Sequence, residues 1–365
     1  MIKHIAFRVD ASAKMGSGHV MRTLTLAQAL RGDGWKCSFF CRLHIGHLVE
    51  LIEAKGFEVY SFQATQYSTQ CSNERLRHAE WLGVSQEQDA KDCIECLSEP
   101  LSWLVVDHYG LDATWERYLR PYTNKIMVID DLADRIHDCD ILLDQNLYSN
   151  SAARYWDLIP SSCISLLGPT YALLREEFAL ERHRLNPRDG KMERLLIFFG
   201  ATDPLALVLR AVEVVATLRG KGFWVDVIAG NLNPQKEEIS KKCSGYGFHY
   251  FEQVSNIASL MAKADVAIGA GGTTVWERCC LGLPSIVSSV AKNQDEGVLF
   301  QSAECLIFYC EPDECFETRL ASLLNELAKS PKTLSEMSTR CLALVDGLGC
   351  QRVIDVLESK KIQVK

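Results

Sequence analysis

The segment RVDASAKMGSGHVMRTLTLAQAL places a histidine where an apolar strand pattern has ended and a helical pattern begins. Asp10 closes the strand, and His19 falls in the first turn of the expected helix. An imidazole at that position feels the positive end of the helix dipole, tends to lose its proton near neutral pH, and can then accept one from water. We therefore predict that His19 is a catalytic base rather than a capping or packing residue.

The loop ahead of His19 consists of small residues. Gly16, Ser17 and Gly18 open the expected helix, whose bare N–H groups and positive dipole end favour a phosphate or another anion. The alternative is a plain strand-to-helix turn. The loop lacks the dinucleotide-binding fingerprint, because no third glycine follows at the required spacing. We predict that this loop binds the substrate, together with Asp10 and Arg22.

A second glycine-rich loop lies in the segment ADVAIGAGGTTVWERCCLGLPSI. Glycines let a backbone approach a diphosphate closely, and this loop offers Gly271 and Gly272. Thr273 and Thr274 can either cap the start of the following helix or form hydrogen bonds with oxygens of the ligand. Glu277 falls one turn into that helix, where its carboxylate could accept from both ribose hydroxyls; the alternative is a solvated helix face. All five residues are predicted to bind the substrate.

Polar residues end a buried strand in the segment WLVVDHYGLD. Ligands of open α/β sheets bind outside the carboxyl ends of the strands, so polar groups at that edge point towards a ligand more often than towards the core. Substrate contact is therefore predicted for Asp107, His108 and Tyr109.

The segments VIDDLADR and LLDQNLY repeat this arrangement of acidic residues at strand ends. Neighbouring acids can hold a metal or perform acid-base chemistry, but loops at strand ends also use aspartate to cap the next helix. We favour capping for most of these residues, which are Asp130, Asp131, Asp144 and Asn146.

Three further loops carry uncharged polar or aromatic side chains. The small residues Gly200 and Thr202 in IFFGATDP are predicted to face the ligand. The amides of Asn293 and Gln294 in KNQ suit the hydroxyl or acetamido groups of a sugar, although Asn293 is also in place for a helix N-cap. The segment YFEQVSNIASLM could carry a nucleobase pocket, and core packing explains its Phe251 equally well.

Cysteines and histidines do not form the pattern of a metal site. The chain has 15 cysteines, and we expect them to be reduced and mostly buried. Cys93 and Cys96 form a C-x-x-C pair, but no second pair follows at the spacing of a structural zinc site. His44 and His47 lie on an expected helix without an acidic third ligand. We predict neither a metal nor a cofactor.

Apolar runs of strand length alternate with helical stretches along the whole chain. The expected strands are HIAFRV, CSFFC, EVYSF, WLVVD and KIMVID in the first half, and LLIFF, WVDVIAG, ADVAIG, PSIVS and LIFYC in the second. Such strands fit parallel sheets covered on both faces. The polar stretch RHRLNPRDGKMER separates the two series. We therefore expect an α/β protein with two doubly wound, Rossmann-like domains, residues 1–185 and 191–345, that face a central cleft, and a terminal helix in residues 346–365.

Composition narrows the range of partners. The 365 residues include 39 Lys and Arg against 47 Asp and Glu, a net charge of −8, and the basic residues form no stripe that would neutralise a phosphate backbone. Nucleic acid and anionic membranes are therefore poor candidates. No segment has the pattern of a signal peptide or of a membrane span. We expect a cytoplasmic protein with a small-molecule substrate; the sequence carries no prediction of the oligomeric state.

Taken together, these motifs resemble the nucleotide-sugar hydrolases of the pseudaminic acid pathway, which cleave UDP-2,4-diacetamido-2,4,6-trideoxy-β-L-altropyranose. The likeness runs over nearly the whole chain. The segments that carry it are RVDAS…MGSGHVMRTLTLA, VVDHYGLD, LLDQN, GPTYALLREEF, FFGATDP and GAGGTTVWERCCLGLP…KNQ. The second half also looks like the UDP-binding domain of GT-B glycosyltransferases, especially those that add N-acetylglucosamine to a lipid acceptor. The segment around residues 63–88 departs from the hydrolase pattern.

By this resemblance the fold is GT-B, the terminal helix crosses back to the first domain, and the reaction is hydrolysis at C1 of the sugar with release of UDP. The family's histidine falls on His19, which activates the attacking water. Its tyrosine and asparagine fall on Tyr109 and Asn293, in the sugar site, and its UDP loop falls on the glycine loop that ends at Glu277. The resemblance implies no metal. Attack on C1 opposite the phosphate implies inversion, and the product is expected to serve pseudaminic acid biosynthesis and flagellin glycosylation.

Three other functions stay open. A glycosyltransferase of the same fold would use the same UDP loops and give the sugar to an acceptor hydroxyl. A non-catalytic nucleotide-sugar sensor would have little use for a neutral histidine beside the leaving phosphate. A hydrolysing epimerase that acts on another UDP-amino sugar has closely related chemistry.

Overall fold

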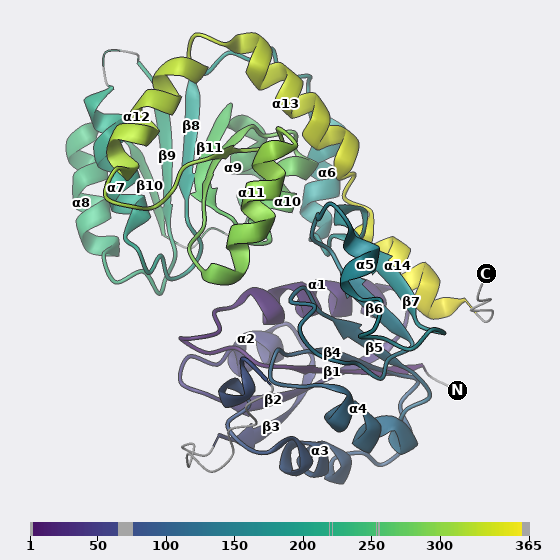
Figure 1. Cartoon of the computed structure of the whole chain (residues 1–365). Coiled ribbons are helices and arrows are strands. Elements are labelled where there is room, and N and C mark those ends of the chain that lie inside the picture. Colours follow the sequence, from purple (N-terminus) through teal and green to yellow (C-terminus); the bar gives the residue numbers. More distant parts are fainter. Residues whose placement is uncertain are drawn as a thin grey trace. The chain divides into compact units, whose positions relative to one another are not determined.

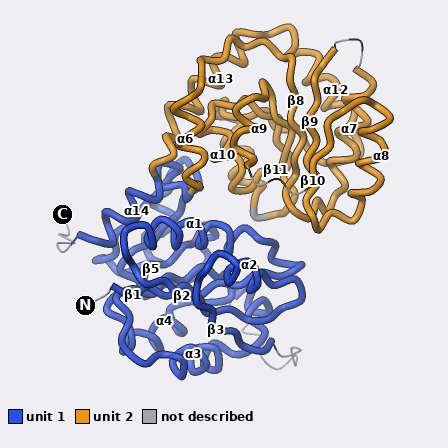
Figure 2. The backbone as a smooth tube through the Cα atoms, turned by 180° about the vertical axis from the view of Figure 1, so that it is seen from behind, with its two compact units in different colours: residues 1–173, 349–365 blue, residues 174–348 orange. Residues whose placement is uncertain are grey.

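The computed structural model of the chain describes residues 3–64, 76–218, 220, 222–252, 254 and 256–359, with the side chain of Asn293 left out. The chain forms two compact units (Figure 2). The first consists of residues 1–173 and 349–365, and the second of residues 174–348. Each unit contains a parallel sheet with helices on both faces (Figure 1).

The first unit has, within its described residues, a seven-stranded sheet in the order β3-β2-β1-β4-β5-β6-β7. All neighbouring strands in it run parallel. The strands are β1 (His4–Val9), β2 (Lys36–Leu43), β3 (Glu58–Gln63), β4 (Trp103–Asp107), β5 (Ile126–Ile129), β6 (Ile141–Asp144) and β7 (Ile164–Leu167). The α-helices are α1 (Gly18–Gly32), α2 (Val49–Ala54), α3 (Gln86–Glu95), α4 (Ala113–Leu119), α5 (Ser151–Arg154) and α14 (Gly349–Glu358). Because β2 and β4 flank β1, the strand order reverses there, and the carboxyl ends of β1 and β4 form the switch point of the sheet.

Apolar side chains alternate along β1 and fill both faces of this sheet. Ile5, Phe7 and Val9 join a buried cluster on the face that α1 and α14 cover (Figure 1). Ala6 belongs to a second cluster that includes residues of α3 and α4, among them Trp115. Burial on both faces explains the continuous apolar pattern of the strands. Polar side chains therefore gather where the strands end.

The second unit has, within its described residues, a six-stranded sheet in the order β10-β9-β8-β11-β12-β13, also parallel throughout. Its strands are β8 (Arg194–Phe198), β9 (Trp224–Ala229), β10 (His249–Glu252), β11 (Val266–Ala270), β12 (Ser285–Ser288) and β13 (Phe308–Tyr309). Its α-helices are α6 (Glu176–Arg184), α7 (Leu207–Thr217), α8 (Lys236–Tyr246), α9 (Ile257–Lys263), α10 (Thr274–Cys280), α11 (Asp295–Ala303), α12 (Phe316–Leu327) and α13 (Pro331–Leu344). The order reverses between β8 and β11, so the loop after β11 lies at the switch point.

The predicted architecture of two doubly wound parallel sheets is confirmed. None of the expected apolar runs covers β6, of which the segment LLDQNLY marks only the end, and β7 and β10 are missed altogether. Both strands lie at the edge of their sheets, and most of their residues are only half-buried or exposed. An edge strand buries less apolar surface than a central one, so neither strand has the continuous apolar run that marks the others.

The boundary between the units lies earlier than the polar stretch that was expected to separate the domains. Residues 174–185 belong to the second unit, because α6 packs against α9 and α10 there. The Arg182 guanidinium fixes this packing, since it donates to the carbonyl oxygens of Cys280 (2.7 Å), Leu342 (2.8 Å) and Val345 (3.0 Å). The terminal helix α14 belongs to the first unit and packs against α1.

His44 and His47 do not lie on a helix, which corrects the prediction for this segment. They lie in the loop between β2 and α2. Gly46 adopts a φ of +85°, and a Cβ there would approach the Ala13 nitrogen to 3.0 Å. This turn, which requires a glycine, interrupts the helical pattern.

The cysteines that the structure describes are free thiols, with Cys93 inside α3 and Cys96 at its C-terminal cap. No group of three or more His, Cys, Asp or Glu side chains among the described residues is arranged to hold a metal ion. Within the same part of the chain, no helix has both the length and the apolar character needed to cross a membrane.

Candidate functional site

The polar cluster at the switch point of the first unit centres on His19, the second residue of α1. Gly16 adopts a φ of +75° and donates from its nitrogen to the Ser12 carbonyl oxygen (2.8 Å), which forms the tight turn before the helix. The helix then carries the imidazole to the end of β4. There the His19 Nδ1 lies 2.6 Å from Oδ1 of Asp107, whose side chain is completely buried.

Arg22 lies one helical turn after His19 and binds the same carboxylate. Its Nε donates to Oδ2 of Asp107 (2.7 Å) and its Nη2 donates to Oδ1 (2.7 Å). Burial alone would raise the pKa of Asp107, but the Arg22 charge, followed by the His19 ring, holds that pKa below its ordinary value. Asp107 is therefore ionised and acts only as an acceptor.

This pairing determines the tautomer of His19. The Asp107 carboxylate can only accept, and Arg22 Nη2, 3.3 Å from His19 Nδ1, is itself a donor. His19 Nδ1 must therefore carry a proton, which it donates to Asp107. In the neutral ring the lone pair then lies on Nε2, the arrangement in which a histidine accepts a proton from water or from a hydroxyl group.

Tyr109 packs the edge of His19, with 4.5 Å between ring centroids and 84° between the ring planes. Its hydroxyl donates to Oδ1 of Asp131. Burial, followed by the charge of Asp131, raises the pKa of Tyr109 well above its ordinary value, so the phenol keeps its proton. The sequence placed Tyr109 in the catalytic set; in the structure its hydroxyl is held by Asp131 and its ring orients His19.

Asp131 is the main residue of this cluster that the sequence did not select. Its carboxylate accepts from the Tyr109 hydroxyl, from Arg22 Nη1 (3.2 Å) and from Asn146 Nδ2 (3.3 Å). Its position in the sequence could have indicated its place in the cluster: Asp131 follows the end of β5, and β5 lies next to β4, so the carboxyl ends of both strands lie at the same edge of the sheet.

The neighbouring Asp130 does not cap the next helix, as was predicted for most of these acids. It accepts from the Ala133 nitrogen (2.9 Å) within a turn and pairs with Arg135 Nη1 (2.8 Å), whereas Asn150 is the N-cap of α5.

Asp10 and His108 do not face a ligand as predicted, because both are buried inside the first unit. Arg8 donates to both carboxylate oxygens of Asp10 (2.7 and 2.9 Å). His108 Nε2 lies 3.3 Å from Asp10 Oδ2, and its Nδ1 accepts from the Gly110 nitrogen (3.0 Å). Burial lowers the pKa of His108, which keeps the ring neutral. Asp10 and His108 therefore form hydrogen bonds and ion pairs in the interior of the unit, beneath the ends of the strands.

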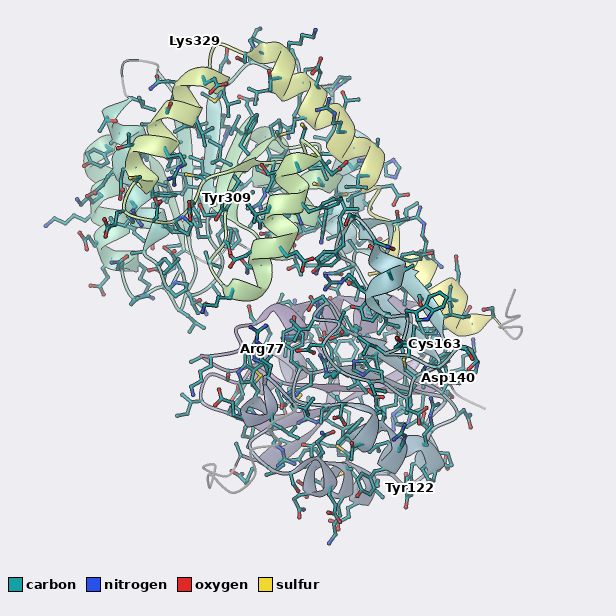
Figure 3. The ribbon with its side chains drawn as sticks, viewed as in Figure 1. Arg77, Tyr122, Asp140, Cys163, Tyr309 and Lys329 are labelled. Carbon is teal, nitrogen blue, oxygen red and sulfur yellow. The ribbon has the colours of Figure 1, made fainter. Side chains whose placement is uncertain are left out.

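Two aromatic residues from the segment around residues 63–88 also reach the cluster. Residues 65–75 of that segment lie outside the described residues, but the short 3₁₀-helix η2 (Ala79–Trp81) is described. Trp81 stacks on Tyr109 with 5.6 Å between centroids, and His78 lies 4.4 Å from Trp81. The preceding Arg77 marks this region in Figure 3.

In the second unit, the glycine loop follows β11 as predicted. The Gly271 nitrogen donates to the Ser288 carbonyl oxygen (3.0 Å), and a Cβ on Gly271 would come within 2.3 Å of Val298 Cγ2. Gln294 packs over the loop: a Cβ on Gly272 would lie 3.6 Å from its Nε2, and its Oε1 accepts from the Val290 nitrogen (3.1 Å). The loop therefore has room only for glycine at position 271.

Arg278 holds the two ends of this loop from below. It is 1% exposed, and it donates to the Ala270 carbonyl oxygen (2.7 Å) and to the Thr274 hydroxyl (3.4 Å). Its buried Nε has no hydrogen-bond partner among the described residues, and burial lowers its pKa to about 10, although Cys279 and the Glu277 charge act in the opposite direction. Thr273 occupies the N-cap position of α10 but makes no side-chain capping bond. A buried cation thus lies under the loop.

Glu277 is not on a solvated helix face. Its side chain is 15% exposed, and Arg175 Nη2 lies 3.2 Å from its Oε1. Burial raises the pKa of Glu277 although the Arg175 charge acts in the opposite direction. Arg175 comes from the segment GPTYALLREEF, whose role in this site the sequence alone did not reveal.

The remaining predicted residues lie in two other loops of the second unit. Gly200, with a φ of +92°, and Thr202 follow β8, in a loop that Asp203 orders by accepting from the Leu207 and Val208 nitrogens at the start of α7 (2.9 Å each). Asn293 lies in η6 (Lys292–Gln294), but its side chain is outside the described residues.

A pocket of about 540 Å³ opens at the carboxyl end of β10. It is lined by Tyr250, Phe251, Glu252, Val254, Asn256, Ser259 and Leu260. The Tyr250 hydroxyl is buried, and none of the described residues forms a hydrogen bond with it. Phe251 therefore lines a pocket, one of the two roles that the sequence left open for it.

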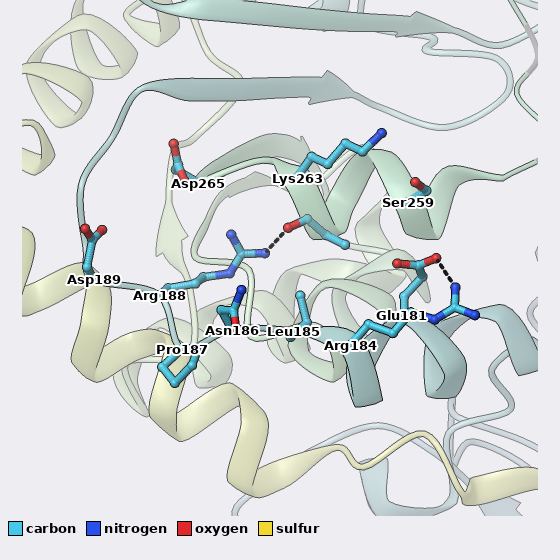
Figure 4. A pocket seen from close by; sticks show the side chains of 11 residues that line it. Glu181, Arg184, Leu185, Asn186, Pro187, Arg188, Asp189, Ser259, Lys263 and Asp265 are labelled. Atoms are coloured by element: carbon cyan, nitrogen blue, oxygen red, sulfur yellow. Dashed lines mark hydrogen bonds and ion pairs between the residues drawn. The ribbon is translucent and has the colours of Figure 1, made fainter.

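A second pocket, of about 400 Å³, lies beside the linker that follows α6 (Figure 4). Arg188 crosses it and donates to the Met261, Ala262 and Ala264 carbonyl oxygens at the end of α9. Lys263 and Asp265, which immediately precede β11, also line it, so it lies at the amino edge of the sheet. Ligands of open α/β sheets bind at the opposite edge, which makes this pocket a poor candidate.

The profile of the glycosyltransferase family 28 C-terminal domain matches residues 194–346, inside the second unit. The chain is 28% identical over 293 residues to the UDP-2,4-diacetamido-2,4,6-trideoxy-beta-L-altropyranose hydrolase of Campylobacter jejuni, a match that covers 80% of this chain and 93% of that protein. It is 23% identical over 371 residues to the spore coat polysaccharide biosynthesis protein SpsG of Bacillus subtilis, which covers 97% of this chain and 98% of that protein.

An uncharacterised protein of Methanocaldococcus jannaschii, MJ1062, is 24% identical over 290 residues; the match covers 78% of this chain but only 55% of the archaeal protein. Among solved structures, MurG of Acinetobacter baumannii superposes with a TM-score of 0.63 at 14% identity, covering 98% of this chain and 99% of that one. The predicted GT-B fold is therefore confirmed, and the second unit matches the C-terminal domain of glycosyltransferase family 28.

Proposed function

We propose that the protein is a nucleotide-sugar hydrolase that cleaves UDP-2,4-diacetamido-2,4,6-trideoxy-β-L-altropyranose into UDP and the free sugar. The observation that carries this proposal is the His19–Asp107 pair, which presents a base with a fixed tautomer at the end of β4. The name of the Campylobacter jejuni relative, which shares most of its length with this chain, supports the choice of substrate.

In the proposed reaction, His19 Nε2 takes a proton from a water molecule. The water oxygen forms a bond to C1 of the sugar as the bond between C1 and the phosphate oxygen breaks, and that electron pair leaves with UDP. The Asp107 carboxylate stabilises the imidazolium that forms, and Arg22 keeps that carboxylate ionised. Attack from the side opposite the phosphate inverts C1.

The second unit is proposed to bind the UDP part. The Gly271 N–H is already donated to the Ser288 carbonyl oxygen, so the Gly272 N–H is proposed to face the diphosphate, and the buried Arg278 adds positive charge below the loop. The Glu277 carboxylate accepts from the ribose hydroxyls. The pocket at the end of β10 is large enough for a nucleobase, and Tyr250 and Phe251 supply aromatic surface for it.

The other predicted residues have supporting roles in this proposal. The turn at Gly16, Ser17 and Gly18 precedes a helix of 15 residues, whose N-terminus favours an anion. Asn293 and Gln294 are proposed to contact the acetamido groups and the loop, respectively, and Gly200 and Thr202 to approach the phosphates. A cytoplasmic place in pseudaminic acid biosynthesis, leading to flagellin glycosylation, belongs to the same proposal and rests on the family likeness.

A glycosyltransferase is the second candidate, favoured by the match of residues 194–346 to the family 28 C-terminal domain. The same histidine would then take its proton from the hydroxyl of an acceptor instead of from water. The two functions differ in whether the sugar is released when only water is present.

The test is an incubation of the purified chain with the UDP-linked diacetamido sugar and no acceptor, followed by proton NMR from the first turnover. We expect UDP and the free sugar in equal amounts, with the inverted anomer appearing first. An intact substrate that is consumed only after an acceptor such as a lipid-linked sugar is added would replace the hydrolase with the transferase.

A further inference from the structure

Three aromatic rings stand beside the proposed catalytic base and form what we call the aromatic wall, which consists of His78, Trp81 and Tyr109. Trp81 and Tyr109 are nearly parallel, with an interplanar angle of 29°. His78 contacts both, at centroid distances of 4.4 Å to Trp81 and 5.6 Å to Tyr109. Two of these rings come from the segment that departs from the hydrolase pattern.

The wall is fixed to the strand end that carries Asp107. Gly110 has no side chain where a Cβ would meet the His78 carbonyl oxygen at 2.9 Å, so η2 packs directly on the turn after β4. The Trp81 nitrogen donates to the same carbonyl oxygen (3.0 Å). The position of Trp81 is therefore coupled to the position of Asp107 through backbone contacts.

The wall lies within reach of a sugar bound at His19. The His19 ring centroid lies 4.5 Å from that of Tyr109 and 6.5 Å from that of Trp81. A water molecule held by a base lies about 3 Å from it, and the atom under attack lies about 3 Å further on. A sugar in position for attack is then as close to His19 as the wall itself.

The exposure of Trp81 distinguishes it from a packing residue. The described tryptophans of the sheet cores are almost completely buried, with Trp103 at 4%, Trp115 at 0% and Trp276 at 1% exposure, and Trp156 is 82% exposed. Trp81 is half-buried, so part of its indole surface remains free for a ligand. Burial lowers the pKa of His78 and raises that of Tyr109, so the wall carries no charge near neutral pH.

We propose that the aromatic wall binds the apolar face of the sugar and that Trp81 determines the preference for a 6-deoxy, N-acetylated hexose. This inference rests on the proposed function, because it places the sugar at His19. Large aromatic rings bury apolar surface and line most small-molecule sites. The C6 methyl and the acetamido methyl groups supply such surface, whereas the C6 hydroxyl of an ordinary hexose would lose hydrogen bonds to water against the rings.

The test compares Trp81→Ala, Trp81→Phe and the matched control Trp156→Ala in steady-state hydrolysis. We expect Trp81→Ala to lower kcat/KM for the UDP-linked diacetamido sugar about tenfold or more, and to lose the preference over UDP-N-acetylglucosamine. Trp81→Phe should retain activity within about threefold, since a smaller ring keeps the apolar surface. Trp156→Ala should match the wild type. The Kd of UDP alone should be the same in all four proteins, which also shows that each variant is folded.

A second measurement separates this inference from the proposed function. Saturation-transfer NMR with free 2,4-diacetamido-2,4,6-trideoxy-L-altrose reports sugar binding without any turnover. Signals at the methyl groups in the wild type that disappear in Trp81→Ala would support the wall even if the chain proves to be a transferase. Normal hydrolysis together with unchanged kcat/KM and unchanged methyl signals in Trp81→Ala would overturn the inference and leave the hydrolase proposal intact.

Discussion

In the first unit, side-chain ion pairs fix His19, the proposed base. In the second unit, backbone contacts and one buried cation shape the loop at Gly271, which is proposed to hold an anion. Around His19, Asp107 accepts from both His19 and Arg22. Around Gly271, the contacts come from a backbone nitrogen, and Arg278 donates only to a carbonyl oxygen and a hydroxyl.

The difference follows from what each task requires. A general base must keep one tautomer, and a paired carboxylate provides that. An anion site gains from close approach of backbone N–H groups and from positive charge that is not already neutralised. Changes to the His19–Asp107 pair should therefore affect turnover and leave UDP affinity unchanged, and changes to the loop at Gly271 should do the reverse.

The largest effect is expected for His19→Ala. Without the base, water must attack without general base catalysis, and kcat should fall by about 10³ to 10⁴. The Kd of UDP, measured by calorimetry, should stay at the wild-type value. A loss of UDP affinity in the same variant would contradict the assignment of catalysis to the first unit and of UDP binding to the second.

Asp107→Asn should cost somewhat less, with kcat reduced about 100-fold or more. An asparagine can keep one acceptor oxygen for Arg22, but its amide N–H would then donate to His19 Nδ1 and move the ring proton to Nε2. The pH profile of kcat is the second readout, because a purely structural role for Asp107 would lower activity without changing its shape. An unchanged kcat would show that the pair does not set the tautomer.

Gly271→Ala should affect binding instead. The new Cβ would lie 2.3 Å from Val298 Cγ2, so the loop must move, and the Kd of UDP should rise about tenfold or more, which corresponds to about 1.4 kcal/mol. Gly245→Ala in α8 is the matched control, because a Cβ there meets nothing within 4 Å. Equal UDP affinity in both variants would exclude the loop from the nucleotide site.

The smallest effect concerns the stability of the first unit and involves Asp144. Its Oδ1 accepts from the Asn146 nitrogen (2.9 Å), and the Tyr155 hydroxyl lies 3.0 Å from its Oδ2. Burial, followed by the charge of Asp131, raises its pKa from 3.8 to about 7. The folded state thus binds a proton that the unfolded state has released, and this stabilisation is present at low pH and lost as the pH rises through 7.

Asp144→Asn should remove this dependence, since its amide can donate to Tyr155 at every pH. Relative to the wild type, the variant should gain up to about 3 kcal/mol in unfolding free energy between pH 5 and pH 8, because two pH units separate pH 5 from the folded pKa and each corresponds to about 1.4 kcal/mol. Thermal melts at the two pH values provide the measurement. A difference between the proteins that stays constant with pH would mean that Asp144 is ionised throughout.

The sequence allowed the two sheets and both switch-point loops to be predicted, because central strands such as β1 and β4 are continuously apolar and end in polar residues. The start of α6 could not be found in this way. The boundary between Leu173 and Leu174 falls within an apolar stretch, with no change in composition.

The pairing within the candidate site was harder to predict than its position. Arg22 and Asp107 are separated by 85 residues, and nothing local in the sequence joins them. The interior position of Asp10 did have a signal: Arg8 lies within an apolar strand, and a buried arginine requires carboxylate partners. A basic residue inside an apolar strand pattern therefore indicates that nearby acidic residues pair with it in the core and are not part of the ligand site.

The most direct test of the central claim is to run the reaction in oxygen-18 water, with the UDP-linked diacetamido sugar and no acceptor, and to locate the label by mass spectrometry. We predict one labelled oxygen in the free sugar and none in UDP, because water is proposed to attack C1 under the control of His19. Label in UDP would mean attack at phosphorus and would contradict the account.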